Sequence, residues 1–114
     1  MSFLYKPKDK KDLLSLIQNP KVSLGDIDTS LITDMEELFL NSERTDFTGI
    51  ENWSTSGVTN MKSMFCGACN FNLPIGSWDT SHVTNMSHMF EDADSFIQSH
   101  IFPVTFVTSR HISV

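Results

Sequence analysis

Hydrophobic residues recur along this chain with a period of about 25 residues. Three blocks of sequence carry large apolar residues at equivalent positions: LGDIDTSLITDMEELF (24–39), IENWSTSGVTNMKSMF (50–65) and IGSWDTSHVTNMSHMF (75–90). The blocks begin at Leu24, Ile50 and Ile75, so the repeat is 26 residues (24 to 50) and then 25 residues (50 to 75). A fixed period of about 20–50 residues is typical of proteins built from stacked repeats.

Each block predicts a short strand, a polar turn and a short helix. A large apolar residue follows the first one by three positions, at Ile27, Trp53 and Trp78, and then DTS or STS turns the chain. The apolar residues that follow have the i, i+3, i+4 spacing of one helical face. They are Met35, Leu38 and Phe39; Met61, Met64 and Phe65; and Met86, Met89 and Phe90. A strand here would bury Asn85 or His88 beside the methionines, so a two-turn helix with Thr33, Thr59 or Thr84 as its N-cap is favoured.

The two ends of the chain do not fit the repeat. Residues 9–18 predict a helix with Asp9 as its N-cap, which would cover the open end of the first coil. Residues 97–114 include an alternating stretch around Val104 and Phe106 that predicts one strand. This tail either folds back as a C-terminal cap, or it pairs with a second chain or stays disordered.

The repeats resemble those of the BspA-like leucine-rich-repeat proteins of bacteria, whose unit reads roughly W-D-[VT]-S-N-V-T-N-M-S-x-M-F. Residues 53–72 and 78–96 follow that pattern closely, residues 24–50 follow it loosely, and the resemblance spans residues 3–96. It implies a surface-exposed or secreted protein of adhesion or host contact. No secretory leader is visible in residues 1–20, so the chain as written is expected in the cytoplasm.

The fold expected from pattern and resemblance together is α/β, a short right-handed leucine-rich-repeat-like solenoid of about three coils. Each coil would hold a short parallel strand and a two-turn helix, beneath an N-terminal capping helix. One domain, 1–114, would comprise the cap (1–23), three repeats (24–98) and a non-repeat tail (99–114).

Charge limits the range of partners. The chain of 114 residues has a formal net charge of -6, and it lacks the basic face that phosphate backbones and anionic membranes require. No stretch reaches the roughly 18 apolar residues of a membrane span. We therefore expect neither nucleic acid binding nor membrane insertion.

Cys66 and Cys69 form the one motif that suggests chemistry. The C-x-x-C spacing suits a metal or a redox pair, but no second such pair or histidine pair supplies the remaining ligands of a zinc site. A structural role is favoured, with thiol redox or metal binding as the alternative. His82 and His88 are six residues apart and are expected at the surface. The sequence predicts no enzyme, cofactor or metal.

The sequence therefore favours a non-enzymatic module that binds an unidentified protein. The variable positions between the buried columns are the candidate contacts: Gly25, Asp26, Glu51, Asn52, Gly76 and Ser77. Trp53 and Trp78 share a column with Ile27 and are expected in the core rather than stacked on sugars. The module is either a monomer or a dimer through its tail, and a remnant of a longer array is a further alternative.

Overall fold

The computed structural model describes residues 3–96. Its elements are helix α1 (Lys10–Ile17) and two 3₁₀ turns, η1 (Leu24–Asp26) and η2 (Ile50–Asn52). Within the described residues there is no β-strand, and pairing is confined to isolated parallel bridges. The predicted α/β solenoid, with a parallel strand and a helix in every coil, is therefore wrong. The predicted tail strand lies outside the described residues.

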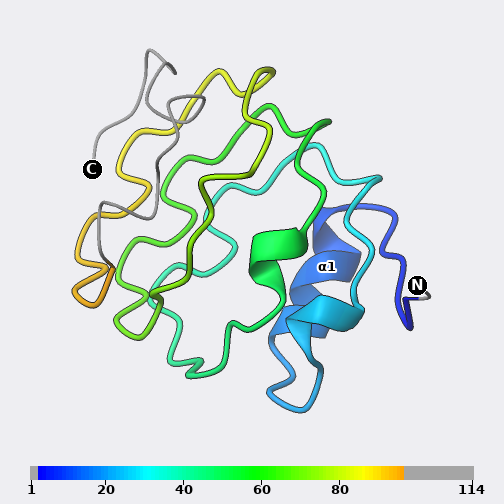
Figure 1. Ribbon diagram of the computed structural model, residues 1–114, viewed down its shortest axis with the longest axis horizontal. Coiled ribbons are helices and arrows are strands. Elements are labelled where there is room, and N and C mark those ends of the chain that lie inside the picture. The colour runs from blue at the N-terminus through cyan, green and yellow to red at the C-terminus, as the bar shows by residue number, and fades with distance from the viewer. Residues whose placement is uncertain (1–2, 97–114) are drawn as a thin grey trace.

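Helix α1 confirms the helix predicted over residues 9–18. The Asp9 side chain caps it by accepting a 2.9 Å hydrogen bond from the backbone N–H of Asp12. Leu13 and Ile17 are four residues apart, on one face of the helix, and both are buried. The helix lies at the N-terminal end of the repeats (Figure 1), and Leu13 and Ile17 belong to the same buried cluster as the apolar side chains of the repeats.

Successive repeats lie side by side and are joined through their backbones. The N–H of Met35 donates to the carbonyl of Asn60 at 2.9 Å, and the N–H of Met61 donates to that of Asn85 at the same distance. Phe65 continues the second row by donating to Met89 at 2.9 Å. The repeat seen in the sequence is thus a repeat in space, as the parallel turns of chain in Figure 1 show.

Left-handed residues explain why the predicted two-turn helices do not form. Glu37, Ser63 and His88 stand at equivalent positions in the middle of these segments, with φ of 59°, 54° and 59°. A helix needs every residue in the right-handed region. N–H groups of these segments donate to carbonyls of the next repeat instead of to a carbonyl four residues back. The apolar side chains at positions i, i+3 and i+4 are therefore buried by tight turns, not by a helix.

The segments predicted as strands are also turns. The N–H of Trp53 bonds the carbonyl of Ile50 at 3.0 Å, and Trp78 bonds Ile75 at the same distance. These three-residue turns place both large side chains of each segment in the core. A flat strand would send side chains three positions apart to opposite faces.

Equivalent aromatic side chains stack from one repeat to the next. The ring of Phe65 lies 5.5 Å from that of Phe39 and 5.9 Å from that of Phe90, with interplanar angles of 2° and 3°. Phe71 lies 3.9 Å from Phe65 and joins a second column that includes Phe47. Buried Trp53 and Trp78 extend the core, which confirms their predicted burial.

Buried polar groups are paired between repeats. The indole N–H of Trp53 donates to the Leu24 carbonyl at 2.8 Å, and that of Trp78 donates to the Ile50 carbonyl at 3.1 Å. The buried Thr29 hydroxyl donates to the Ser54 carbonyl at 2.9 Å. These bonds remove the cost of burying the polar atoms and fix the register of each repeat on its neighbour.

The loop after the first repeat is longer than its counterpart in the second, and it returns to α1. The guanidinium of Arg44 donates to the carbonyls of Ile17 (3.0 Å), Asn19 (3.4 Å) and Val22. These carbonyls lie at and after the C-terminal end of α1, where the last carbonyls of a helix have no partner inside it. Arg44 therefore holds the capping helix to the first repeat.

Candidate interaction face

The turns η1 and η2 bring most of the sequence-predicted contact residues to one face. Figure 1 shows η2 near the middle of the view, on the side turned to the viewer. A shallow hollow of about 280 Å³ lies between η2 and the corresponding turn of the third repeat. Its lining is mostly polar and consists of Glu51, Asn52, Trp53, Ser54, Thr55, Ser56, Ser77, Trp78 and Asp79.

A second hollow of about 310 Å³ adjoins the first on the side of the N-terminus. It is lined by Phe3, Gly25, Ile27, Gly49, Asn52 and Trp53. Asn52 and Trp53 line both hollows, so the two hollows lie next to each other, and we name the pair the η2 groove. One end of the η2 groove is apolar and the other end is polar.

Two glycines allow the floor of the apolar end to form. A Cβ atom on Gly49 would lie 2.4 Å from the Cα of Gly25, and Gly49 has a φ of +99°. Any other residue at position 49 would therefore be strained in its backbone and would collide with η1. Gly49 was not among the residues predicted from the sequence, although glycine is the residue that most readily adopts a positive φ.

The polar end of the groove carries two carboxylates held by local hydrogen bonds. Glu51 Oε1 accepts from the N–H of Gly49 at 2.9 Å, and Asp79 Oδ1 accepts from the N–H of Ser81 at 3.0 Å. The side-chain and backbone hydrogen bonds from Ser81 lower the pKa of Asp79 from its ordinary value. Asp79 is therefore ionised at neutral pH, and its hydrogen bonds favour one orientation of the carboxylate.

Four of the six predicted contact residues line the groove, and two do not. Gly25, Glu51, Asn52 and Ser77 line it. Gly76 is buried, and half-buried Asp26 uses its carbonyl to accept the backbone N–H groups of Leu4 and Tyr5. Sequence spacing could not tell which residues of each turn face outward, and contact of these residues with a partner stays a prediction.

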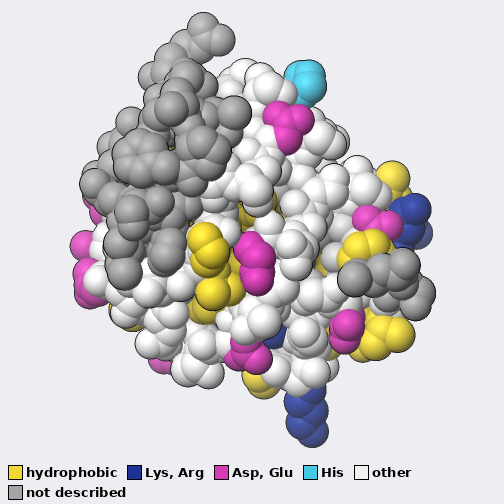
Figure 2. All heavy atoms as spheres, in the orientation of Figure 1, with side chains coloured by type: hydrophobic (Ala, Val, Ile, Leu, Met, Phe, Trp, Pro, Cys, Tyr) yellow, Lys and Arg dark blue, Asp and Glu magenta, His cyan; other side chains and the backbone are white. Residues whose placement is uncertain are grey.

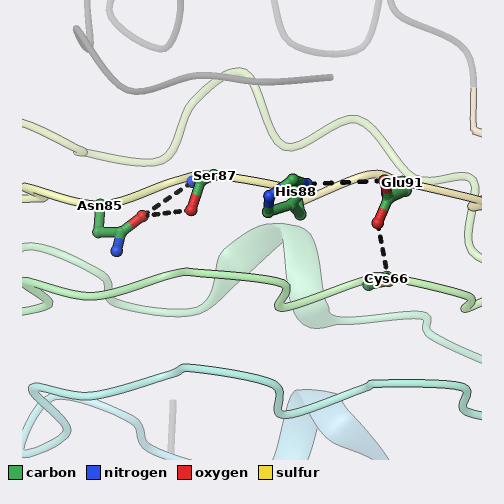
Figure 3. Close-up of polar contacts among 5 residues, drawn as sticks. All are labelled: Cys66, Asn85, Ser87, His88 and Glu91. Carbon is green, nitrogen blue, oxygen red and sulfur yellow. Dashed lines mark hydrogen bonds and ion pairs between the residues drawn. The ribbon is translucent and has the colours of Figure 1, made fainter.

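Figure 3 shows the surroundings of Cys66, a residue that lines neither hollow. The Cys66 thiol donates to Glu91 Oε2 at 3.9 Å, and Glu91 Oε1 lies 3.6 Å from His88 Nδ1. Partial burial, and next to it the charge of Glu91, raises the pKa of the Cys66 thiol above its ordinary value. The thiol is therefore protonated at neutral pH, which makes it a poor nucleophile.

The other chemical candidates, Cys69 and His82, each contact a backbone carbonyl. Cys66 and Cys69 are both free thiols, and the exposed Cys69 donates to the Gly67 carbonyl at 3.4 Å. The His82 ring lies 3.0 Å from the Ser56 carbonyl and is exposed. Within residues 3–96, no three His, Cys, Asp or Glu side chains are placed to hold a metal ion. No helix in that range is long and apolar enough to cross a membrane.

Fold and groove together define a small protein of stacked, mostly irregular repeats with a solvent-facing groove between neighbouring turns. The chain belongs to the family described as "Mycoplasma protein of unknown function, DUF285", which matches residues 10–111. No curated protein and no solved structure matches the chain.

Proposed function

We propose that this chain is a non-enzymatic protein-interaction module that binds its partner through the η2 groove. The observation that carries the proposal is that two hollows of different chemistry meet there at the shared residues Asn52 and Trp53. Complementary apolar and polar contacts close together are what a specific protein interface needs.

The stacking of the repeats supports this role. Trp53 is fixed by an indole hydrogen bond to the preceding repeat, and Asn52 lies on η2 between Gly49 and Trp53. A surface that is ordered before binding loses little conformational entropy when it binds. The resemblance to BspA-like repeat proteins supports the same proposal, with adhesion or host contact as its biological setting.

Thiol redox or metal chemistry at Cys66 and Cys69 is the competing proposal, and it has less support. The raised pKa of Cys66 disfavours the thiolate that a redox nucleophile or a metal ligand must supply. Titration of both thiols at neutral pH, together with an assay for bound zinc, tests this alternative directly. Rapid modification of Cys66 or stoichiometric zinc would support it.

A retention experiment with surface variants tests the proposed function. The full chain is immobilised and exposed to an extract of its source cells. Asn52→Arg and Ser77→Arg each place a long cation on an exposed residue of the groove, and Thr45→Arg places one on an exposed residue outside it. We expect one protein to be retained by the native chain and by Thr45→Arg, and to fall at least tenfold with either groove variant. Equal retention by all four proteins, or no retained protein, would contradict the proposal.

A further inference from the structure

The two ends of the η2 groove differ in the side chains that they can accept. The hollow beside Phe3 is bounded by the Gly25–Gly49 contact, Ile27 and Trp53, so it suits an apolar side chain. The hollow that Glu51 and Asp79 line is polar. An occupant that fills both hollows therefore has an apolar group next to a polar or charged one.

Charge decides which polar group fits. Neither hollow is lined by a lysine, arginine or histidine. Glu51 accepts a backbone hydrogen bond from Gly49, and Asp79 accepts hydrogen bonds from the backbone and side chain of Ser81 and has the His82 ring near it. Within residues 3–96 neither carboxylate forms a salt bridge with a lysine or arginine. An anionic group would be repelled here, whereas an ammonium or guanidinium group would meet two carboxylates that no lysine or arginine already pairs with.

The protein as a whole is also negatively charged. On the face shown in Figure 2, acidic side chains lie among hydrophobic ones, and lysine and arginine side chains lie toward its lower and right-hand parts. The chain as a whole carries a formal net charge of -6. The field of the protein therefore attracts a cationic partner before contact is made.

We propose that the η2 groove binds a basic segment of a partner protein, in which an apolar side chain stands close to a lysine or arginine. The apolar side chain occupies the hollow beside Phe3, and the cation lies between Glu51 and Asp79. This inference rests on the proposed function and adds to it the chemistry of the partner. The two residues stand within a few positions of each other in the segment, because the two hollows adjoin.

Selection from a library of short random peptides, with the full chain as bait, tests the inference. We expect selected peptides to combine an aromatic or aliphatic residue with lysine or arginine. For a selected peptide, Glu51→Gln and Asp79→Asn are each expected to weaken binding about threefold, as is usual for exposed ion pairs. The double variant should weaken binding about tenfold, and added salt should weaken binding to the native chain. Asp94→Asn removes an exposed carboxylate outside the groove and should leave the affinity unchanged.

Several outcomes would overturn this inference without touching the proposed function. They are peptides selected without a cation, no selected peptide, or equal affinity of a selected peptide for the native chain and both carboxylate variants. If Asn52→Arg still abolishes retention of a protein from the extract, the groove is a binding face for a partner of different chemistry. If Asn52→Arg leaves that retention unchanged as well, the proposed function fails with the inference.

Discussion

At some turns of this protein the backbone conformation or a side-chain hydrogen bond depends on the type of a single residue. Gly49 combines a left-handed backbone with a close approach to Gly25, and Asp79 forms a side-chain turn with Ser81. Both residues belong to turns rather than to regular elements. In a fold with few helices and strands, the conformations of a few turn residues determine the path of the chain.

Gly49→Ala should destabilise the protein by about 1–3 kcal/mol, because alanine resists a positive φ and its Cβ would collide with Gly25. Urea unfolding measures the change. Gly57→Ala is the matched control, since its Cβ would meet only the Ile32 carbonyl at 3.8 Å, an ordinary contact. A loss of stability no larger for Gly49→Ala than for Gly57→Ala would show that η1 and η2 do not pack as described.

The Asp79 carboxylate makes the folding stability of the protein depend on pH. Its pKa in the folded state lies below its ordinary value of about 3.9. The unfolded chain therefore takes up the proton first as the pH falls. The stabilisation is complete above about pH 5, and it is lost as the pH falls through the folded pKa.

Asp79→Asn keeps the acceptor oxygen for Ser81 but removes the titration. We expect its melting temperature to fall less steeply below about pH 4 than that of the native chain. Thermal melts recorded from pH 3 to pH 7 measure the difference. Parallel curves for the two proteins would mean that the Asp79 turn does not contribute to the acid sensitivity.

Elements show most clearly where sequence reasoning succeeded and where it failed. Helix α1 was predicted because capping and apolar spacing are local signals, and both agree over residues 9–18. The two-turn helices were wrong because tight turns can produce the same i, i+3, i+4 burial. Left-handed φ at Glu37 or His88 has no strong local signal, because neither residue type is glycine.

His88→Gly should raise the stability by about 0.5–1 kcal/mol, because glycine adopts the left-handed conformation at this exposed position without steric cost. Chemical unfolding at pH 7 measures it. Lys62→Gly is the control at an exposed residue that is not left-handed, and it should lower the stability. If both substitutions destabilise equally, the turn at residue 88 is not left-handed in solution.

At the scale of the whole molecule, the columns of equivalent side chains make the repeats depend on one another. The burial of the tryptophan and methionine columns was predictable from their recurrence, since a repeat must hide its apolar residues against its neighbours. The sequence located the segments that hold the candidate contact residues. It did not show which of these residues face the solvent, because that depends on the geometry of each turn. Asn52 is exposed and Gly76 is buried, a difference that the spacing of the repeats does not reveal.

Trp78→Ala should cost about 3–5 kcal/mol, the usual range for emptying a buried aromatic site, because the indole is 2% exposed and bonds the Ile50 carbonyl. Denaturant unfolding followed by circular dichroism measures the loss. Ser77→Ala, at the exposed neighbouring position, should change the stability by less than about 0.5 kcal/mol. A cost below about 1 kcal/mol for Trp78→Ala would mean that the indole faces water.

Arg44 bears on the order in which the protein assembles. Three carbonyls in and just after α1 receive their donors from a residue more than twenty positions further along the chain. The Asn19 carbonyl also accepts from the N–H of Val22, but the helix acquires its anchor to Arg44 only after the first repeat has been synthesised. The final attachment of the cap therefore depends on a residue from the loop that follows the repeat it covers.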